Sequence, residues 1–182
     1  YVFSVDIQPI EPLDSSQTDL IKLDITSNSA IEYLKKKLPD HVDVVVSDIS
    51  PDVSGIWDLD HFRQIHLAKI SFQIATRFLK FGGNFLIKVF QGNELENFIK
   101  EFKKYFRQTR IIRPKATRTS SSELYLLGLG FKKKKKKDSF INLKKKGLFG
   151  EKQILHRFWF FLFKKLFHLK GNFLNLLWNL KM

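Results

Sequence analysis

The sequence predicts a three-layer α/β domain whose central sheet is mainly parallel. Apolar, β-branched runs alternate with segments of helical periodicity in the order β-β-α-β-α-β-α-β-β. The run at residues 42–48 (VDVVVSD) is typical of a strand buried in a parallel sheet. Hydrophobic residues make up 43% of the 182 residues, enough for one core, and the absence of cysteine excludes a disulfide scaffold.

The expected strands are short apolar runs followed by an acid, a proline or a glycine. We place them at residues 1–6, 20–24, 42–48, 84–90, 109–113 and 124–129.

Three helices are expected between these strands. Ser27 or Ser29 is a typical N-cap for the first helix, and Pro39 stops it. Asp58 or Asp60 caps the second, and a pair of glycines gives it the usual C-terminal signal. The third helix has one continuous apolar face. They span residues 27–38, 58–82 and 94–106.

The formal net charge of +14 suggests a polyanionic partner or an anionic surface, but the charge is unevenly distributed. Residues 1–131 hold 17 basic and 16 acidic side chains, whereas residues 132–182 hold 15 basic and 2 acidic ones. The predicted domain is therefore nearly neutral, and the C-terminal tail carries the positive charge.

Three expected strands end in an acid, at Asp6, Asp24 and Asp48. Ligands of such sheets bind at the carboxyl ends of the strands, where an acid commonly accepts hydrogen bonds from ribose hydroxyls. A further acid there can accept from an adenine amino group. Each acid alone is equally typical of an Asx turn, but three in register favour a nucleoside ligand.

Lys88 is the most informative residue, because it interrupts an apolar strand where a lysine is costly to bury. A buried lysine can serve as a general base. The alternative is a lysine on an edge strand that points to solvent. Glu123 opens another apolar strand, where a polar role and a plain exposed glutamate are both plausible.

Other polar residues carry weaker signals. Arg113, Lys115 and Arg118 lie in the loop before the last strand, where they could contact RNA phosphates or form a solvated basic loop. His61 and His66 are five residues apart, which does not suit a shared metal site. We expect both at the surface or beside the site, and we expect no metal.

Three segments resemble the FtsJ family of RNA 2′-O-ribose methyltransferases. They are SDISPDVSG at 47–55, GGNFLIKVFQG at 82–92 and RPKATRTSSSELY at 113–125. The resemblance covers residues 1–131 and is closest to the archaeal members. The intervals of 40 residues from Asp48 to Lys88 and 35 from Lys88 to Glu123 fit the family's Lys-Asp-Lys-Glu tetrad.

The resemblance implies a Rossmann-like methyltransferase fold, S-adenosyl-L-methionine as cofactor and RNA as substrate. It favours 2′-O-ribose methylation of a uridine in large-subunit ribosomal RNA. Two alternatives are a tRNA 2′-O-ribose methyltransferase and a non-catalytic RNA-binding relative. We expect a cytoplasmic protein, because no signal peptide or apolar run long enough to span a membrane is visible. We also expect a monomer.

The resemblance also implies residue roles. Lys88 takes the proton of the ribose 2′-OH, Asp48 orients that lysine and the methyl donor, and Glu123 completes the polar cluster. Asp6 binds the cofactor ribose, and Asp24 binds its adenine.

The family's glycine-rich first motif and the first lysine of its tetrad do not occur in this sequence. In the family, the corresponding first strand lies between the strands expected at 1–6 and 42–48. Because Met182 is the only methionine and the chain opens at Tyr1 in a β-like run, we expect an N-terminally truncated fragment. The loss of the first strand would leave two unpaired edges in the sheet, so we expect the fragment to be inactive and aggregation-prone when expressed alone. The function described above is then that of the intact parent protein.

The tail, residues 132–182, has three interpretations. It begins with six consecutive lysines and continues into an aromatic, basic segment at 154–169. It fits a membrane-surface helix or an appended RNA-binding arm. The interpretation we favour is a frame-shifted, non-native tail, because a lysine run implies a poly-A tract in which reading frames slip.

Overall fold

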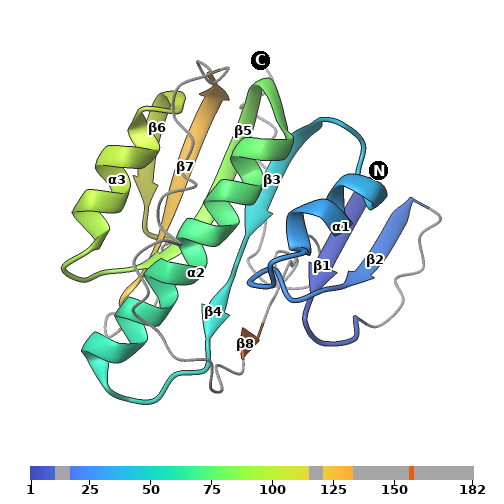
Figure 1. Ribbon diagram of the computed structural model, residues 1–182. Coiled ribbons are helices and arrows are strands. Elements are labelled where there is room, and N and C mark those ends of the chain that lie inside the picture. The colour runs from blue at the N-terminus through green and yellow to red at the C-terminus, as the bar shows by residue number, and fades with distance from the viewer. Residues whose placement is uncertain (11–16, 115–120, 133–155, 158–182) are drawn as a thin grey trace.

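The computed structural model describes residues 1–10, 17–114, 121–132 and 156–157 (Figure 1). The order of elements along these residues follows the expected alternation of strands and helices. In chain order they are β1 (Val2–Asp6), β2 (Thr18–Lys22), α1 (Ala30–Lys37), β3 (Val42–Ser47), β4 (Ser50–Pro51), α2 (Trp57–Phe78), β5 (Leu79–Phe90), α3 (Leu95–Lys103), β6 (Phe106–Ile112), β7 (Glu123–Phe131) and β8 (His156–Arg157).

The main strands form two sheets. One has four strands in the order β3-β5-β7-β6, the other pairs β1 with β2, and β4 pairs with β8 in a two-residue ladder. The β1–β2 and β3–β5 pairs are parallel, and only β7 is reversed within the four-stranded sheet. The predicted α/β class with a mainly parallel sheet is therefore confirmed.

The two sheets are separate, and β1 lies beyond the edge of β3 that does not pair with β5 (Figure 1). No ladder joins β1 to β3 in the described part of the chain. The break falls where the resemblance places the family's first strand, between residues 1–6 and 42–48.

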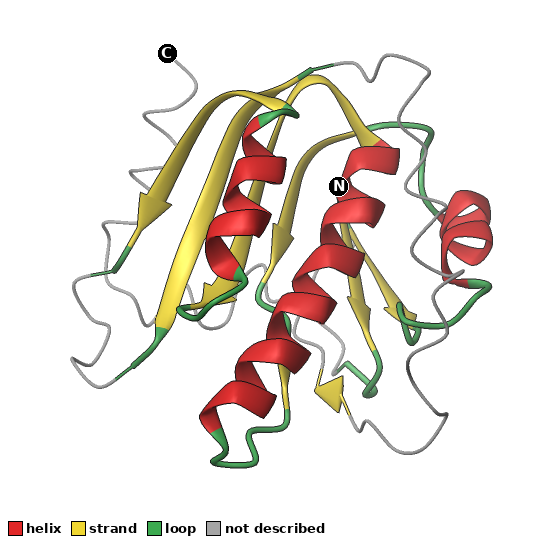
Figure 2. Ribbon diagram, turned by 60° about the vertical axis from the view of Figure 1, so that its left-hand side comes forward, coloured by secondary structure: helices red, strands yellow, loops and turns green. Residues whose placement is uncertain are grey.

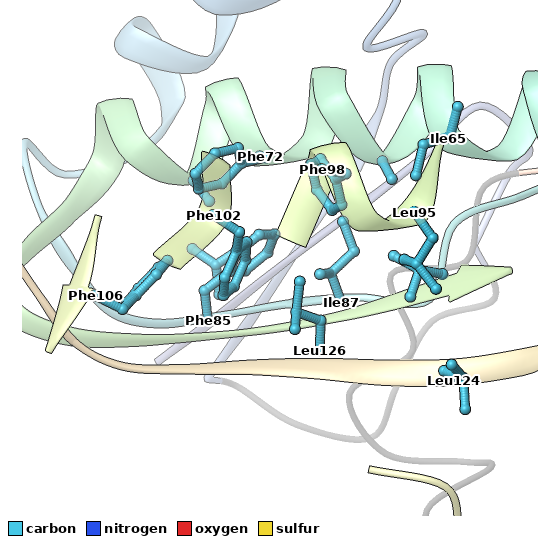
Figure 3. Packing of buried hydrophobic residues seen from close by; sticks show 14 of the residues in the cluster. Ile65, Phe72, Phe85, Ile87, Leu95, Phe98, Phe102, Phe106, Leu124 and Leu126 are labelled. Atoms are coloured by element: carbon cyan, nitrogen blue, oxygen red, sulfur yellow. The ribbon is translucent and has the colours of Figure 1, made fainter. Parts of the chain in front are cut away.

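The core of the four-stranded sheet lies under α2 and α3, which cover one of its faces (Figure 2). Phe85, Ile87 and Val89 alternate along β5 toward these helices and are almost completely buried. Phe102 of α3 packs over Phe85, and its ring centroid lies 4.6 Å from that of Phe106 (Figure 3). Because this side of β5 is densely packed, the residues between these positions project from the opposite face.

Helix α2 also packs against the smaller sheet. Its Leu67, Ile74 and Phe78 share a second cluster with Val5 of β1 and Ile21 of β2. One helix therefore connects the cores of the two sheets, although the sheets share no ladder.

The glycines at 82 and 83 do not end a helix. Helix α2 ends at Phe78, and both glycines lie inside β5, where the pairing with β3 shifts register between Val42 and Val44. Gly82 has a positive φ of 81°, and a Cβ on Gly83 would lie 2.8 Å from the Asp43 carbonyl oxygen. The two glycines allow the register shift in this strand. In the sequence alone, glycines with this role look the same as glycines that end a helix.

The other helix ends differ from expectation by a few residues. Ser29 occupies the N-cap of α1, but its side chain makes no capping hydrogen bond. Helix α2 begins before Asp58 and Asp60, and the Asp60 carboxylate instead accepts hydrogen bonds from backbone N–H groups of the preceding loop. Helix α3 ends at Lys103, so Phe106 belongs to a strand.

The tail predicted at 132–182 lies outside the described residues, apart from Lys132 and the two residues of β8. Within the ranges that the structure describes, no helix is both long and apolar enough to cross a membrane.

Candidate active site

Lys88 lies in β5 and is buried, with 7% of its surface exposed. Its neighbours Ile87 and Val89 point into the core under α2 and α3, so Lys88 projects from the opposite face. Strand β5 pairs with β3 on one side and with β7 on the other. The interpretation of Lys88 as an exposed edge-strand lysine is therefore wrong.

Two carboxylates approach the Lys88 ammonium group from the neighbouring strands. Nζ lies 3.1 Å from Oδ1 of Asp48, which directly follows β3, and 4.0 Å from Oε1 of Glu123, the first residue of β7. The structure thus brings together three residues that the sequence separates by 40 and 35 positions. Their opposite charges offset the cost of burying the ammonium group.

Tyr125 is a member of this cluster that the sequence analysis did not single out. It lies directly opposite Lys88 in the β5–β7 register, and its hydroxyl donates to Asp48 Oδ1 over 3.2 Å. Burial, and then the carboxylates of Asp48 and Glu123, raise the pKa of Tyr125, so its hydroxyl remains a proton donor at neutral pH. Its two-residue interval from Glu123 is the signal that could have found it, because alternate strand residues share a face.

Asp6 and Asp24 belong to the smaller sheet, where Asp6 is the last residue of β1 and Asp24 follows the end of β2. Asp6 is buried, its Oδ1 accepts the N–H of Gln8 over 2.7 Å, and burial raises its pKa. Asp24 Oδ1 accepts the N–H and the hydroxyl of Thr26 over 2.8 and 2.7 Å. Both therefore form local Asx-type turns, and their roles toward a cofactor stay predictions.

The basic loop is only partly described. The side chain of Arg113 is exposed, and its Nη2 donates to the Ser121 carbonyl across the ends of β6 and β7 over 3.0 Å. Lys115 and Arg118 lie outside the described residues. Contact with RNA stays a prediction for all three.

The two histidines differ. His66 is exposed, as expected, but His61 is buried, and its Nε2 accepts the N–H of Glu94 over 3.2 Å. Burial lowers the pKa of His61 and favours the neutral ring that this bond requires. No group of three His, Asp or Glu side chains in the described ranges is placed to hold a metal ion.

A family model of FtsJ-like methyltransferases matches residues 1–131, which include all four residues of the lysine cluster, Asp48, Lys88, Glu123 and Tyr125. The chain belongs to the FtsJ-like methyltransferase family. Its relatives include the ribosomal RNA large subunit methyltransferase E of Archaeoglobus fulgidus, 46% identical over 132 residues, which are 72% of this chain and 68% of the relative. The enzyme of the same name from Methanocaldococcus jannaschii is 38% identical over 74% of this chain and 56% of the relative.

A third relative, from Methanococcus maripaludis, is 37% identical over 74% of this chain and 52% of its own length, so the chain spans about half of some relatives that it matches. Among solved structures, a putative ribosomal RNA methyltransferase from Plasmodium falciparum superposes with a TM-score of 0.62. It is 20% identical and covers 71% of both chains, which supports the fold alone.

Proposed function

We propose that the protein transfers a methyl group from S-adenosyl-L-methionine to a ribose 2′-oxygen of RNA, on a uridine of large-subunit ribosomal RNA. The observation that carries this proposal is the buried Lys88 paired with Asp48 and Glu123. Membership of the FtsJ-like methyltransferase family supports methyl transfer, and the names of the archaeal relatives favour ribosomal RNA over tRNA.

The residues at the strand ends of the smaller sheet fit the cofactor. Asp6 and Asp24 lie at or just beyond the carboxyl ends of the parallel strands β1 and β2, where hydroxyl and amino groups of nucleosides bind. Each uses Oδ1 in its turn, and a carboxylate can accept further hydrogen bonds. S-adenosyl-L-methionine supplies an electrophilic sulfonium methyl group when bound.

Lys88 accepts the proton of the ribose 2′-OH at Nζ as that oxygen becomes a nucleophile. It can do so only as a neutral amine. Asp48 and Glu123 then hold Nζ in a fixed direction, while the Tyr125 hydroxyl holds Asp48. The contribution of the chain is positioning together with one proton acceptor.

Arg113, together with Lys115 and Arg118, contacts RNA phosphates and orients the strand without reading its sequence. The exposed guanidinium of Arg113 lies at the end of β6, and the first residue of β7 is Glu123. Arg113→Ala therefore weakens RNA binding and reduces its salt dependence.

Methylation of RNA by the full-length protein and its Lys88 variants tests the proposal. We expect Lys88→Ala to lower kcat by about 10²–10⁴-fold, the usual contribution of a general base. Lys100→Ala, at an exposed position on α3, is the matched control and keeps full activity. Resistance of the labelled nucleotide to alkaline hydrolysis identifies the 2′-oxygen as the acceptor.

Two results contradict the proposal. Undiminished methyl transfer by a folded Lys88→Ala protein excludes Lys88 as the base. RNA binding without methyl transfer by the wild-type protein favours the non-catalytic relative. A comparison of 23S-type ribosomal RNA with tRNA as substrates separates the two enzymatic alternatives.

A further inference from the structure

The side chain of Gln64 is completely buried beneath the strand that carries Lys88. Gln64 lies in the second turn of α2, and 0% of its surface is exposed. Its Nε2 donates to the carbonyl oxygen of Lys88 over 2.8 Å, and its Oε1 accepts the N–H of Phe90 over 3.1 Å. Both hydrogen-bonding sides of the amide are therefore used on the backbone around Val89.

These two bonds continue the ladder of the sheet after a strand has ended. The pairing of β3 with β5 stops at Ser47, which lies opposite Ile87. Beyond that point the Gln64 amide donates to the residue before Val89 and accepts from the residue after it. A residue of a parallel strand placed opposite Val89 would make the same two bonds.

We propose that Gln64 is a positioning residue for Lys88, acting as a one-residue substitute for strand β3. This inference rests on the proposed function of Lys88. Because the Gln64 amide satisfies the β5 backbone, β3 can end at Ser47, and Asp48 is free to leave the sheet and meet Nζ of Lys88. Without the amide, the buried carbonyl of Lys88 and N–H of Phe90 lack partners, and the end of β5 loosens.

A second contact from the same helix supports this role. His61 lies one turn before Gln64 on α2, and its Nε2 accepts the N–H of Glu94. Gly92 lies so close to the His61 ring that a Cβ there would be 2.4 Å from it. Helix α2 therefore holds the chain at two points, just after Lys88 and at the entry to α3.

The test compares substitutions at Gln64 with the same substitutions at Gln73, a partly exposed glutamine on the same helix. Gln64→Met removes both hydrogen bonds at nearly constant volume. We expect faster hydrogen exchange at the Phe90 amide and a changed NMR resonance of the Lys88 ε-carbon in the full-length protein. Gln73→Met leaves both signals unchanged.

In Gln64→Glu, the two hydrogen bonds from this side chain to the β5 backbone should depend on pH. A protonated carboxyl group can donate to Lys88 and accept from Phe90 as the amide does, whereas a carboxylate cannot donate. Burial raises the pKa of such a carboxyl group above its usual range, so a pH titration converts the variant from the protonated to the ionised form. We expect signals close to those of the wild type at low pH and signals like those of Gln64→Met at high pH.

Kinetics provide the functional readout. Misplacement of a catalytic group costs up to about 10²-fold, so we expect Gln64→Met to lower kcat by about tenfold to hundredfold with an unchanged KM for RNA. The activity of Gln64→Glu relative to the wild type falls as pH rises. A purely structural role would instead lower the amount of folded protein and leave kcat per folded molecule unchanged.

The outcomes separate the two proposals. Gln64 is not a positioning residue if the Phe90 amide loses protection in Gln64→Met while the Lys88 resonance and kcat stay the same. If Gln64→Met does not fold, the pH series of Gln64→Glu decides the question in the same way. An inactive wild-type protein contradicts the proposed function alone, because the Lys88 resonance reports its position without turnover.

Discussion

Acids at strand ends make different contacts in the two sheets. In the smaller sheet, Asp6 and Asp24 accept hydrogen bonds from residues two positions further along the chain. At the four-stranded sheet, Asp48 meets Lys88 of the neighbouring strand and Tyr125 of the strand beyond it. The same sequence signature therefore gives a local turn in one region and a long-range polar cluster in the other.

The difference shows what an acid at a strand end needs in order to join a long-range polar cluster. A turn forms from the chain that follows the acid, so it depends little on tertiary packing. The lysine cluster exists only where β3, β5 and β7 lie side by side, and the aromatic core under α2 and α3 holds these strands in place. Perturbing that core should affect the cluster and spare the turns.

The largest expected effect comes from Phe102→Ala. Its ring is completely buried and packs on those of Phe72, Phe85 and Phe106. Removing a buried phenylalanine ring lowers the free energy of unfolding by about 3–5 kcal/mol, which urea unfolding would measure. Ile21→Val in β2 removes only one methyl group from the core of the smaller sheet and should lower the free energy of unfolding by about 0.5–1.5 kcal/mol. A free energy of unfolding of Phe102→Ala equal to that of the wild type would show that the aromatic core does not stabilise the four-stranded sheet.

Asp48→Asn tests the long-range cluster directly. It removes the charge that lies 3.1 Å from Lys88 Nζ and leaves Glu123, at 4.0 Å, as the remaining carboxylate of the pair that faces it. We expect the free energy of unfolding to fall by about 1.5–3 kcal/mol at neutral pH, the range for a hydrogen bond to a charged group. A free energy of unfolding equal to that of the wild type would show that the pair contributes nothing to stability.

Asp6→Asn is the contrasting change and should act in the opposite direction. Burial raises the pKa of Asp6, so the stability associated with its protonated form is present at low pH and lost as the pH rises through that pKa. Asparagine keeps an acceptor for the N–H of Gln8 and carries no charge. We expect the free energy of unfolding at pH 7, measured in urea, to rise by less than about 1 kcal/mol. We also expect calorimetry to show weaker binding of S-adenosyl-L-methionine.

Gly92→Ala tests the junction between β5 and α3. The new Cβ would lie 2.4 Å from the His61 ring, and the ring is fixed by its bond to Glu94. Overpacking of this kind costs about 1–3 kcal/mol. Gly55→Ala is the control for backbone strain alone, because Gly55 has a φ of 83° and open space around it. Amide exchange near Glu94 should rise only in Gly92→Ala.

The smallest expected effect is the pH response of His61. Burial lowers the pKa of His61, so its stabilising contribution is complete above the ordinary histidine pKa of about 6.5 and is lost as the pH falls toward the lower folded value. His61→Gln keeps an acceptor and does not titrate. The free energy of unfolding, measured in urea at pH 7.5 and 5.5, should change less between the two pH values in His61→Gln than in the wild type. An equal change in both proteins would exclude His61 as the source of the pH dependence.

Much of the fold follows from local patterns. The β-branched run at 42–48 is a strand, and the helical spacing of apolar residues after Asp60 marks α2. The glycines at 82 and 83 mislead, because a strand irregularity beside Asp43 and a helix stop use the same residue type. The prediction that Phe106 belongs to the third helix is wrong for a similar reason, because an aromatic residue fits both the end of an amphipathic helix and the start of a strand.

The sequence alone determined which residues could carry the chemistry: a lysine within an apolar strand is unusual enough to be recognised without a structure, and three acids at strand ends favour a ligand when taken together. Only the tertiary structure decided which of them meet. Asp48 contacts Lys88, whereas Asp6 and Asp24 bond to their own turns. It also revealed Tyr125 and Gln64, whose roles depend on strand register and on where β3 ends. Register and strand adjacency result from packing between distant segments, and no local pattern encodes them.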